Sequence, residues 1–283
     1  MARTKISWAE FSWNPIAGCT KVSPGCAKCY AERMAVRQGW MEYGRFKKNS
    51  DAYEITCGFS EGTYSQVVGK KEWNGKVVCI ESALDKPLHW KKSRRIFVNS
   101  MGDTFHESVP FEFIVKMFEV MANAGQHTYQ ILTKRPERMR AFFQSCEDWD
   151  PTEWPNVHLG VSAENQEWAD KRVPHLLATP AAKRFVSLEP LLGPIKLWEQ
   201  LPSGAMLCPG PIATGRGIDQ VIVGAESIGA HAGRECKLEW VRDIVQQCQA
   251  AGVKVRVKQL HIDGKLVKDI NQFPEDLRIR EEI

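Results

Sequence analysis

The sequence predicts an α/β fold, a single (β/α) barrel that is partial or nearly closed and carries loop insertions. Three observations support this. The chain has 283 residues and 43% hydrophobic composition, enough for one large core, and β/α barrels occupy about 250 residues. Short β-branched runs alternate with amphipathic segments from about residue 94 onward. No glycine-rich dinucleotide fingerprint follows a strand, which disfavours the alternative of an open doubly wound sheet.

Short runs rich in β-branched and aromatic residues predict the strands. They are residues 95–99 (RIFVN), 128–132 (TYQIL), 157–161 (VHLGV), 184–188 (RFVSL), 220–223 (QVIV) and 253–257 (VKVRV). Residues 6–13 and 77–80 would supply further strands, for a total of about seven or eight. Strands that alternate with helices form parallel units with right-handed crossovers.

Two amphipathic stretches predict helices between these strands. In residues 111–123, apolar side chains recur at helical spacing on one stripe. Residues 238–251 repeat the pattern and stop at Gly252, as a helix C-terminus should. Pro136 lies near the first turn of a third predicted helix, where proline is tolerated.

Two stretches interrupt this rhythm within one predicted domain that spans residues 1–283. Residues 44–76 are polar, glycine-rich and basic, and we interpret them as an insertion. Residues 202–217 contain three prolines and four glycines, and we interpret them as a long loop. In β/α barrels such additions often cover the face that holds the active site.

Charge and cysteine content indicate the compartment. The formal net charge of +4 permits an acidic partner without requiring one. Nine cysteines is an odd number, and residues 1–5 lack the apolar run of a signal peptide. No apolar stretch approaches the roughly 20 residues that span a bilayer. We therefore expect a cytoplasmic protein without membrane contact, whose cysteines are thiols or metal ligands.

The most specific feature is a loop with the spacing C-x6-C-x2-C, formed by Cys19, Cys26 and Cys29. The loop is rich in Gly and Pro and leads into a helix, whose N-terminus stabilises thiolate charge. Three ligands leave one metal position open, as a catalytic cluster needs, whereas structural zinc takes four. The alternatives are a zinc site with a distant fourth ligand, such as Cys57, Cys79 or a histidine, and unrelated buried thiols.

Polar residues follow each predicted strand, at the end where β/α barrels carry their catalytic face. Each has an ordinary alternative: Glu164 could cap the next helix, Lys134 could be solvated, and Asp103 could close a turn. His106 is a candidate proton donor, but the preferred interpretation is a histidine in a surface turn. Taken with the cysteine loop, the set predicts one site. It comprises Ser100, Asp103, Lys134, Arg135, Ser162, Glu164, Glu189, Glu226 and Lys258.

These motifs resemble known families. A three-cysteine loop after the first strand of a β/α barrel is similar to the radical S-adenosylmethionine (radical SAM) superfamily. Its commonest motif is C-x3-C-x2-C, and this chain keeps C-x2-C while lengthening the first gap to six. The segments WNPIAGCTKVSPGCAKCYAERM, RIFVNSMGDTFHESVP, YQILTKRPERM, RFVSLEPLLGPI and QVIVGAES resemble a phage- and prophage-associated three-cysteine-motif family over most of residues 6–260.

The resemblance implies a radical SAM enzyme with two cofactors, a [4Fe–4S] cluster on Cys19, Cys26 and Cys29, and S-adenosylmethionine. The open iron would chelate the methionyl amine and carboxylate, and reductive cleavage would release a 5′-deoxyadenosyl radical. An external electron donor, flavodoxin-like or ferredoxin-like, would be a partner. The compartment would be the host cytoplasm if the chain is phage-encoded.

The resemblance and side-chain chemistry together suggest roles for the first group of cofactor-binding residues. Ser100 and Asp103 resemble in position the segment that contacts the methionyl amine, and a carboxylate accepts hydrogen bonds from an ammonium. Lys134 or Arg135 suits the methionyl carboxylate. Tyr30 could shield the cluster or the adenine, or simply pack in the core.

The remaining residues are expected to face the ribose and the substrate. Ser162 and Glu164 could hold ribose hydroxyls. Glu189, Glu226 and Lys258 are left as the catalytic group on the substrate side. The type of reaction, whether isomerase, lyase or transferase, stays open.

The substrate hypothesis rests on basic residues mixed with aromatic ones, which can follow phosphates and stack on bases. The alternative is an ordinary solvated surface. The insertion carries Arg45, Lys47, Lys48, Lys70 and Lys71 with Phe46, Tyr53, Tyr64 and Trp73, and Lys91, Lys92, Arg94 and Arg95 form a second run. We expect a nucleobase or nucleotide substrate, with phage DNA modification as the candidate process. Another small metabolite, or a zinc-stabilised nucleic-acid-binding protein, are the alternatives.

Overall fold

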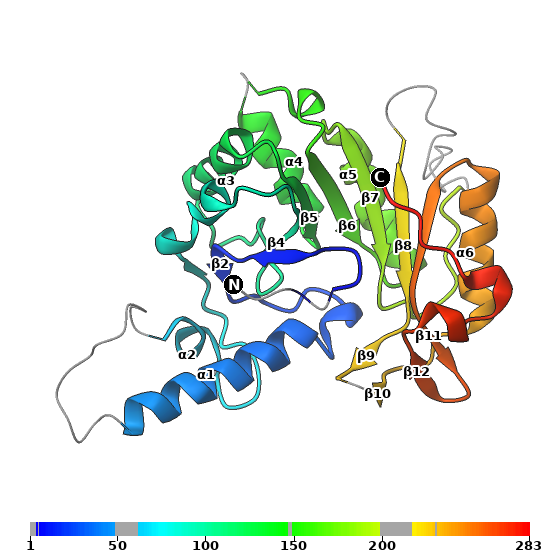
Figure 1. Cartoon of the computed structure of the whole chain (residues 1–283), viewed down its shortest axis with the longest axis horizontal. Coiled ribbons are helices and arrows are strands. Elements are labelled where there is room, and N and C mark those ends of the chain that lie inside the picture. The colour runs from blue at the N-terminus through cyan, green and yellow to red at the C-terminus, as the bar shows by residue number, and fades with distance from the viewer. Residues whose placement is uncertain (1–3, 5, 49–61, 147–148, 199–216, 230) are drawn as a thin grey trace.

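A computed structural model describes residues 4, 6–48, 62–146, 149–198, 217–229 and 231–283, with the backbone alone for residues 43–48. Its centre is an eight-stranded sheet in the order β1-β4-β5-β6-β7-β8-β11-β12 (Figure 1). The strands are β1 (Phe11–Trp13), β4 (Arg95–Val98), β5 (Thr128–Thr133), β6 (Val157–Ser162), β7 (Lys183–Leu188), β8 (Gln220–Gly224), β11 (Lys254–Ile262) and β12 (Lys265–Val267).

Neighbouring strands are parallel from β1 to β11, and only β12 runs antiparallel to its neighbour. Because all seven strands run parallel, their carboxyl ends lie at one edge of the sheet. Within the described residues, an α-helix connects each of the pairs β4–β5, β5–β6, β6–β7 and β8–β11. These helices are α3 (Phe111–Asn123), α4 (Pro136–Ser145), α5 (Gln166–Ala178) and α6 (Leu238–Ala250).

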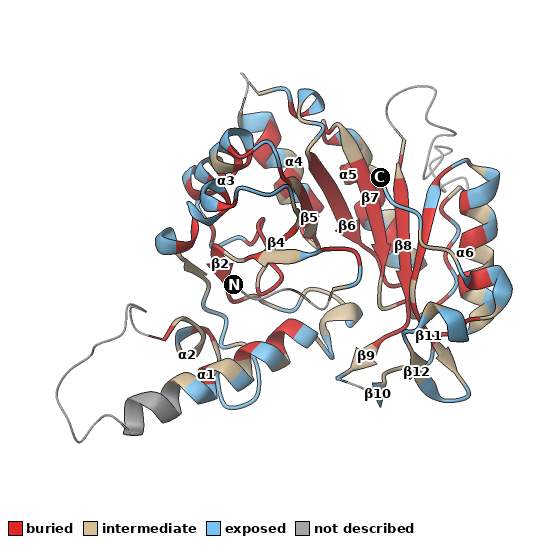
Figure 2. Cartoon of the chain, in the orientation of Figure 1, coloured by how far each residue is buried: buried red, intermediate tan, exposed pale blue. Residues whose placement is uncertain are grey.

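The main core lies between this sheet and the helices. Phe113, Met117 and Met121 of α3 are buried, as are Val241 and Ile244 of α6. Figure 2 shows the strands buried along most of their length, and the helices exposed on the side that turns away from them. Burial of these apolar stripes is what holds the helices against the sheet.

A small second cluster lies on the opposite, inner face of the sheet. The ring of Trp8 lies 4.6 Å from that of Phe97 on β4 and 6.1 Å from that of Phe185 on β7. Two strands, β5 and β6, separate β4 from β7. One indole reaches both because the sheet curves around it. Gly160 on β6 leaves room here, since a Cβ at that position would lie 2.5 Å from the Phe185 ring.

The six predicted strands between residues 95 and 257 are confirmed to within a few residues, as are the helices at 111–123 and 238–251. Of residues 6–13, only Phe11–Trp13 form a strand. Residues 77–80 do not join the main sheet: β3 (Val78–Cys79) pairs with β2 (Ile16–Ala17) in a separate ribbon. A closed barrel is not confirmed, because within the described residues β1 and β12 do not pair with each other.

The two predicted interruptions are described only in part. α1 (Tyr30–Lys48) extends into the expected insertion, and α2 (Thr63–Val67) lies within it, in contact with α1. Residues 49–61 and nearly all of the loop at 202–217 lie outside the described residues. In the part of the chain that the structure describes, no helix has both the length and the apolar character needed to cross a bilayer.

Candidate functional site

A cavity of about 210 Å³ lies at the carboxyl ends of the parallel strands. The cysteine loop and the start of α1 form one wall, and the ends of β4 to β11 form the other. Trp8 and Phe97 of the inner cluster also line it. All predicted site residues except Glu164 line this one cavity: Cys19, Cys26, Cys29, Tyr30, Ser100, Asp103, Lys134, Arg135, Ser162, Glu189, Glu226 and Lys258.

The cysteine loop begins where the chain leaves β2. Gly18 has φ +97, and its amide donates to the Met101 carbonyl at 3.1 Å. A Cβ on Gly18 would lie 2.2 Å from the Lys76 carbonyl oxygen, so only glycine fits. Asn99, after β4, accepts a hydrogen bond from the Ile16 amide at 3.1 Å. The loop entrance is thus fixed against the end of β4.

Arg135 connects the loop to the ends of β4 and β5. Its guanidinium donates to the Cys19 sulfur at 3.6 Å, to the Thr20 carbonyl at 3.1 Å and to the Thr20 hydroxyl at 2.8 Å. It also pairs with Asp103 at 3.2 Å and with Glu107 at 2.9 Å. The side chain is 5% exposed. Its donors are therefore used within the protein, and its contact with a methionyl carboxylate stays a prediction.

Asp103 is similarly occupied. One carboxylate oxygen accepts from the Phe105 amide at 3.0 Å and the Thr133 hydroxyl at 2.7 Å. The other accepts from the Lys134 amide at 3.0 Å and from Arg135. Four donors satisfy a carboxylate, so Asp103 closes a turn and also orders the start of the next β/α connection. Its contact with an ammonium remains a prediction.

The interpretation of His106 as a surface residue is wrong. Its side chain is 4% exposed. One ring nitrogen accepts from the Ser108 amide at 3.1 Å, and the other lies 2.9 Å from the Thr20 hydroxyl. Burial lowers the pKa of His106, and the charge of Arg135 adds to this. Neutral His106 thus belongs to the same set of contacts that holds the cysteine loop.

Glu164 lies beneath the loop rather than in the cavity. The Gly25 amide donates to its carboxylate at 2.9 Å, and Arg172 of α5 donates at 3.2 Å. Both charged side chains are 1% exposed. Glu164 does not cap α5, because that role belongs to Asn165. The buried carboxylate instead fixes the backbone one residue before Cys26, and its contact with a ribose stays untested.

The three thiols suit a soft metal or an iron–sulfur cluster, which thiolates bind. Burial raises the pKa of Cys19 to about 12, and Asp103 adds to this while Arg135 opposes it. Burial also raises the pKa of Cys29, although hydrogen bonds from the Glu32 and Ala31 amides at the start of α1 act to lower it.

All three thiols line one cavity, so the donor chemistry fits a group held by three cysteines. Among the described residues, however, no three His, Cys, Asp or Glu side chains are gathered closely enough to hold a single metal ion. Of the cysteines considered as a fourth zinc ligand, Cys79 lies on β3, and Cys57 lies outside the described residues.

The opposite wall carries an ion pair. The Lys258 ammonium lies 2.6 and 2.7 Å from the two oxygens of Glu189, and Gln259 donates to the same carboxylate at 3.2 Å. Both charged side chains are less than 20% exposed. The Tyr30 hydroxyl donates to the Ser100 carbonyl at 3.0 Å. Burial strongly raises the pKa of Tyr30, so its hydroxyl is neutral.

Glu226 is bound by a neighbour that the sequence did not indicate. Arg234 donates to it through its backbone amide at 2.8 Å and through its guanidinium at 3.0 Å. Burial would raise the pKa of Glu226, but the hydrogen bonds from Arg234 outweigh it and hold the pKa below its usual value. Glu226 is therefore an ionised group at the cavity edge.

Two predicted groups have no such partner. Within the described residues, neither the Lys134 ammonium nor the Ser162 hydroxyl forms a side-chain hydrogen bond, and both residues line the cavity. They are available to a bound molecule. The residues that sequence reasoning missed, Thr20, Glu107 and Arg172, all contact the cysteine loop or its anchors.

Fold and site together define a mixed α/β protein with a cysteine-lined cavity at the carboxyl edge of a mostly parallel sheet. The chain belongs to the DUF5131 family, described as a protein of unknown function, whose profile matches residues 3–270. That match includes every residue of the site. Comparisons with curated proteins and with solved structures gave no match.

Proposed function

We propose that this protein is a radical SAM enzyme that uses a [4Fe–4S] cluster and acts on a nucleobase or nucleotide. One observation carries the proposal. Thiols 7 and 3 residues apart in the sequence line the same cavity as polar groups from the ends of five parallel strands and Lys258 within β11. Chemistry at the carboxyl ends of parallel strands is the rule for β/α enzymes.

The proposed fold is a partial barrel of the radical SAM type. Strands in consecutive order and the curvature around Trp8 support it. Phage or prophage origin, with function in the host cytoplasm, rests on the sequence resemblance alone. A flavodoxin-like or ferredoxin-like electron donor follows from the proposed chemistry, because cleavage of S-adenosylmethionine needs an electron.

Cys19, Cys26 and Cys29 would hold the cluster, which supplies an electron for cleavage of the cofactor. To do so the loop must draw the three sulfur atoms together and release the thiol protons. Arg135 and Glu164 limit that movement, because they fix the backbone beside Cys19 and Cys26.

The other cavity groups would bind and orient. Lys134, near Cys29, offers a free ammonium to a carboxylate or phosphate. Ser162 offers a hydroxyl to a sugar. The Glu189–Lys258 pair would hold a polar substrate group and can pass a proton between the carboxylate and the ammonium. The apolar inner cluster that contains Trp8 would exclude water from the part of the cavity that it lines.

The test is to purify the protein without oxygen and measure iron and sulfide. Reductant and S-adenosylmethionine are then added, and 5′-deoxyadenosine is measured. We expect a brown protein with about four irons per chain, and 5′-deoxyadenosine that increases with a nucleotide substrate. Cys26→Ala should abolish both, whereas the matched control Cys146→Ala, a half-buried cysteine outside the cavity, should keep both.

The alternatives give different results. A colourless protein with one tightly bound zinc would refute the enzyme mechanism and favour a zinc-stabilised nucleic-acid-binding protein. Cofactor cleavage that no nucleotide stimulates would favour another small metabolite as substrate.

A further inference from the structure

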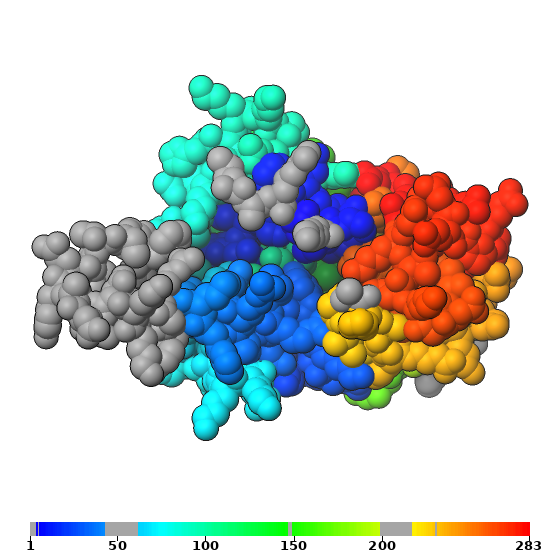
Figure 3. Space-filling view, turned by 60° about the horizontal axis from the view of Figure 1, so that its bottom comes forward, coloured from blue at the N-terminus to red at the C-terminus, as the bar shows by residue number. Residues whose placement is uncertain are grey.

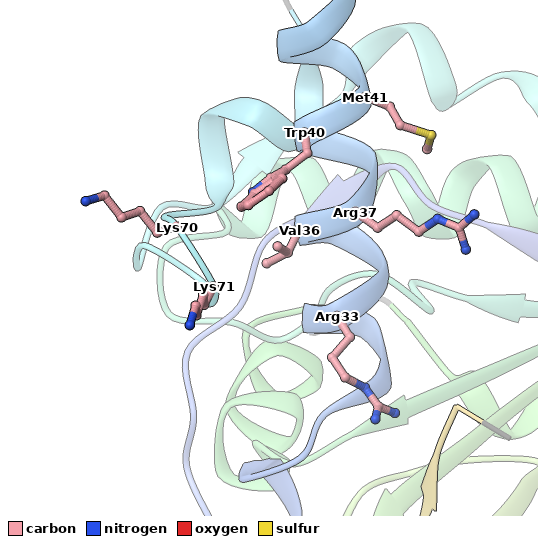
Figure 4. Close-up of a pocket in the computed structure, with 7 residues that line it drawn as sticks. All are labelled: Arg33, Val36, Arg37, Trp40, Met41, Lys70 and Lys71. Atoms are coloured by element: carbon pink, nitrogen blue, oxygen red, sulfur yellow. The ribbon is translucent and has the colours of Figure 1, made fainter. Parts of the chain in front are cut away.

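A second pocket, of about 570 Å³, lies on the surface beside α1 (Figure 4). In Figure 4, Trp40 and Val36 project toward the loop with Lys70 and Lys71, whereas Arg33, Arg37 and Met41 of the same helix point away from that loop. Its lining residues are Arg33, Val36, Arg37, Trp40, Met41, Lys70 and Lys71.

The pocket combines exposed apolar surface with positive charge. Trp40 is 63% exposed and Met41 49% exposed, which is unusual for such large side chains. Arg33, Arg37, Lys70 and Lys71 form no ion pair with any described residue. A cluster of unpaired cations around an uncovered indole is complementary to an anion that carries an aromatic ring.

The acidic residues that the structure describes nearby are directed elsewhere. Glu42 accepts from the amides of Tyr64 and Ser65 at the start of α2. Glu32 and Glu72 both pair with Lys21. They therefore do not neutralise the pocket, and none of the described residues that line it is acidic.

Helix α1 links the pocket to the cavity of the candidate site. α1 starts at Tyr30, which lines the cavity, and Arg33 one turn later donates to the Ser227 carbonyl at 3.0 Å. Ser227 lines the cavity too. In Figure 3 the blue surface of α1 borders the yellow surface of the segment that follows β8. At 1.5 Å of rise per residue, Trp40 lies about 15 Å along the helix from Tyr30.

We propose that this pocket binds single-stranded nucleic acid, with a base stacked on Trp40 and phosphates on the four cations. The inference rests on the proposed function, because it makes a polynucleotide the substrate that α1 leads to the cavity. A single strand is favoured over a duplex, whose bases are already stacked and cannot cover the indole. A concave pocket also suits an inserted base better than it suits a flat anionic membrane.

Fluorescence anisotropy tests this with the full-length protein and a labelled oligothymidine of about 20 nucleotides, over roughly 50–200 mM salt. Trp40→Ala should weaken binding by about fivefold to 150-fold, the loss of one stacked base, and Trp40→Phe should restore most of it. The double variant with Lys70→Glu and Lys71→Glu should reduce the slope of log affinity against log salt concentration by at least about 1.4, because each phosphate contact contributes about 0.7 to that slope.

Lys265→Glu with Lys268→Glu is the matched control, because these lysines are exposed and lie on or beside β12. This variant changes the net charge by the same amount. It should change the affinity by less than about twofold, because salt screens a charge that lies far from the bound strand. Equal weakening by both lysine pairs, or unchanged affinity of Trp40→Ala, would overturn the inference. Equal affinity for a duplex of the same sequence would also overturn it. So would a Trp40→Ala variant that binds the single strand normally and differs only in dimerisation.

The two proposals fail separately. A protein that contains iron and cleaves S-adenosylmethionine, yet binds no single strand, would refute the nucleic-acid pocket and leave the enzyme mechanism standing. A protein that lacks iron but binds single strands through Trp40 would refute the mechanism, and with it the pocket's role in delivering a substrate.

Discussion

The buried pair of Glu164 and Arg172 gives the sharpest test of how the cysteine loop is held. Both side chains are 1% exposed. Glu164→Ala would remove the acceptor of the Gly25 amide and leave the Arg172 guanidinium with the Ser162 carbonyl, 2.9 Å away, as its remaining described acceptor. Breaking a buried ion pair from one side costs about 3–5 kcal/mol, so the free energy of unfolding should fall by that amount.

Urea denaturation measures this change, and hydrogen exchange at the Gly25 amide reports whether the loop has loosened. Glu164→Gln keeps an acceptor without the charge and should lose about 1–3 kcal/mol. Glu167→Ala on the same helix is the matched control. Its carboxylate is 60% exposed and pairs with Lys171 at the surface, so its loss should cost under about 1 kcal/mol. A cost below 1 kcal/mol for Glu164→Ala, with Gly25 still protected, would refute the anchoring role.

Two further predictions concern the inner face of the sheet. Burial lowers the pKa of His158 to about 4, so the folded protein holds this side chain neutral. In the unfolded chain its pKa is about 6.5. The stability that the neutral side chain gives the folded protein above about pH 6.5 is therefore lost as the pH falls toward about 4, because the unfolded state binds the proton first. Urea unfolding at pH 7 and pH 4 should show that His158 accounts for a loss of about 3 kcal/mol in the free energy of unfolding, and His158→Asn should lack this part of the loss. The same pH dependence in both proteins would contradict the prediction. Gly160→Ala should destabilise by about 1–3 kcal/mol, because its Cβ would lie 2.5 Å from the Phe185 ring. Adding Phe185→Leu should relieve this in thermal melts, and no relief would show that the ring is not the cause.

The parts of the fold that the sequence predicted well are those with a strong local pattern. The buried parallel strands are short runs rich in β-branched, aromatic and other apolar residues, and the stripes of α3 and α6 repeat at 3.6 residues. Residues 77–80 looked like another strand of the same kind, but β3 is half-buried and pairs in a small ribbon, which depends on contacts distant in sequence. The antiparallel β12 was missed, although Asp263-Gly264 between β11 and β12 is a typical hairpin turn.

For the site, the sequence predicted location better than role. Parallel strands bring their carboxyl ends together whatever their side chains do, which is why nearly all predicted residues line one cavity. What each side chain contacts depends on partners far along the chain. Arg135 and Asp103 were expected to face a cofactor, yet each fills its hydrogen-bonding capacity within the protein. Arg234, the partner of Glu226, carries no sequence signal that distinguishes it from a surface arginine.

The contacts that fix the cysteine loop also indicate when it forms during folding. Cys19 and Arg135 are 116 residues apart in sequence, and Gly25 and Glu164 are 139 apart. Contacts of such long range form slowly, after local helices and neighbouring strands. The loop at the start of the chain must therefore wait until β4, β5 and β6 have paired. Any metal would then be delivered to an assembled sheet, and its insertion would be a late step in maturation rather than a nucleus for folding.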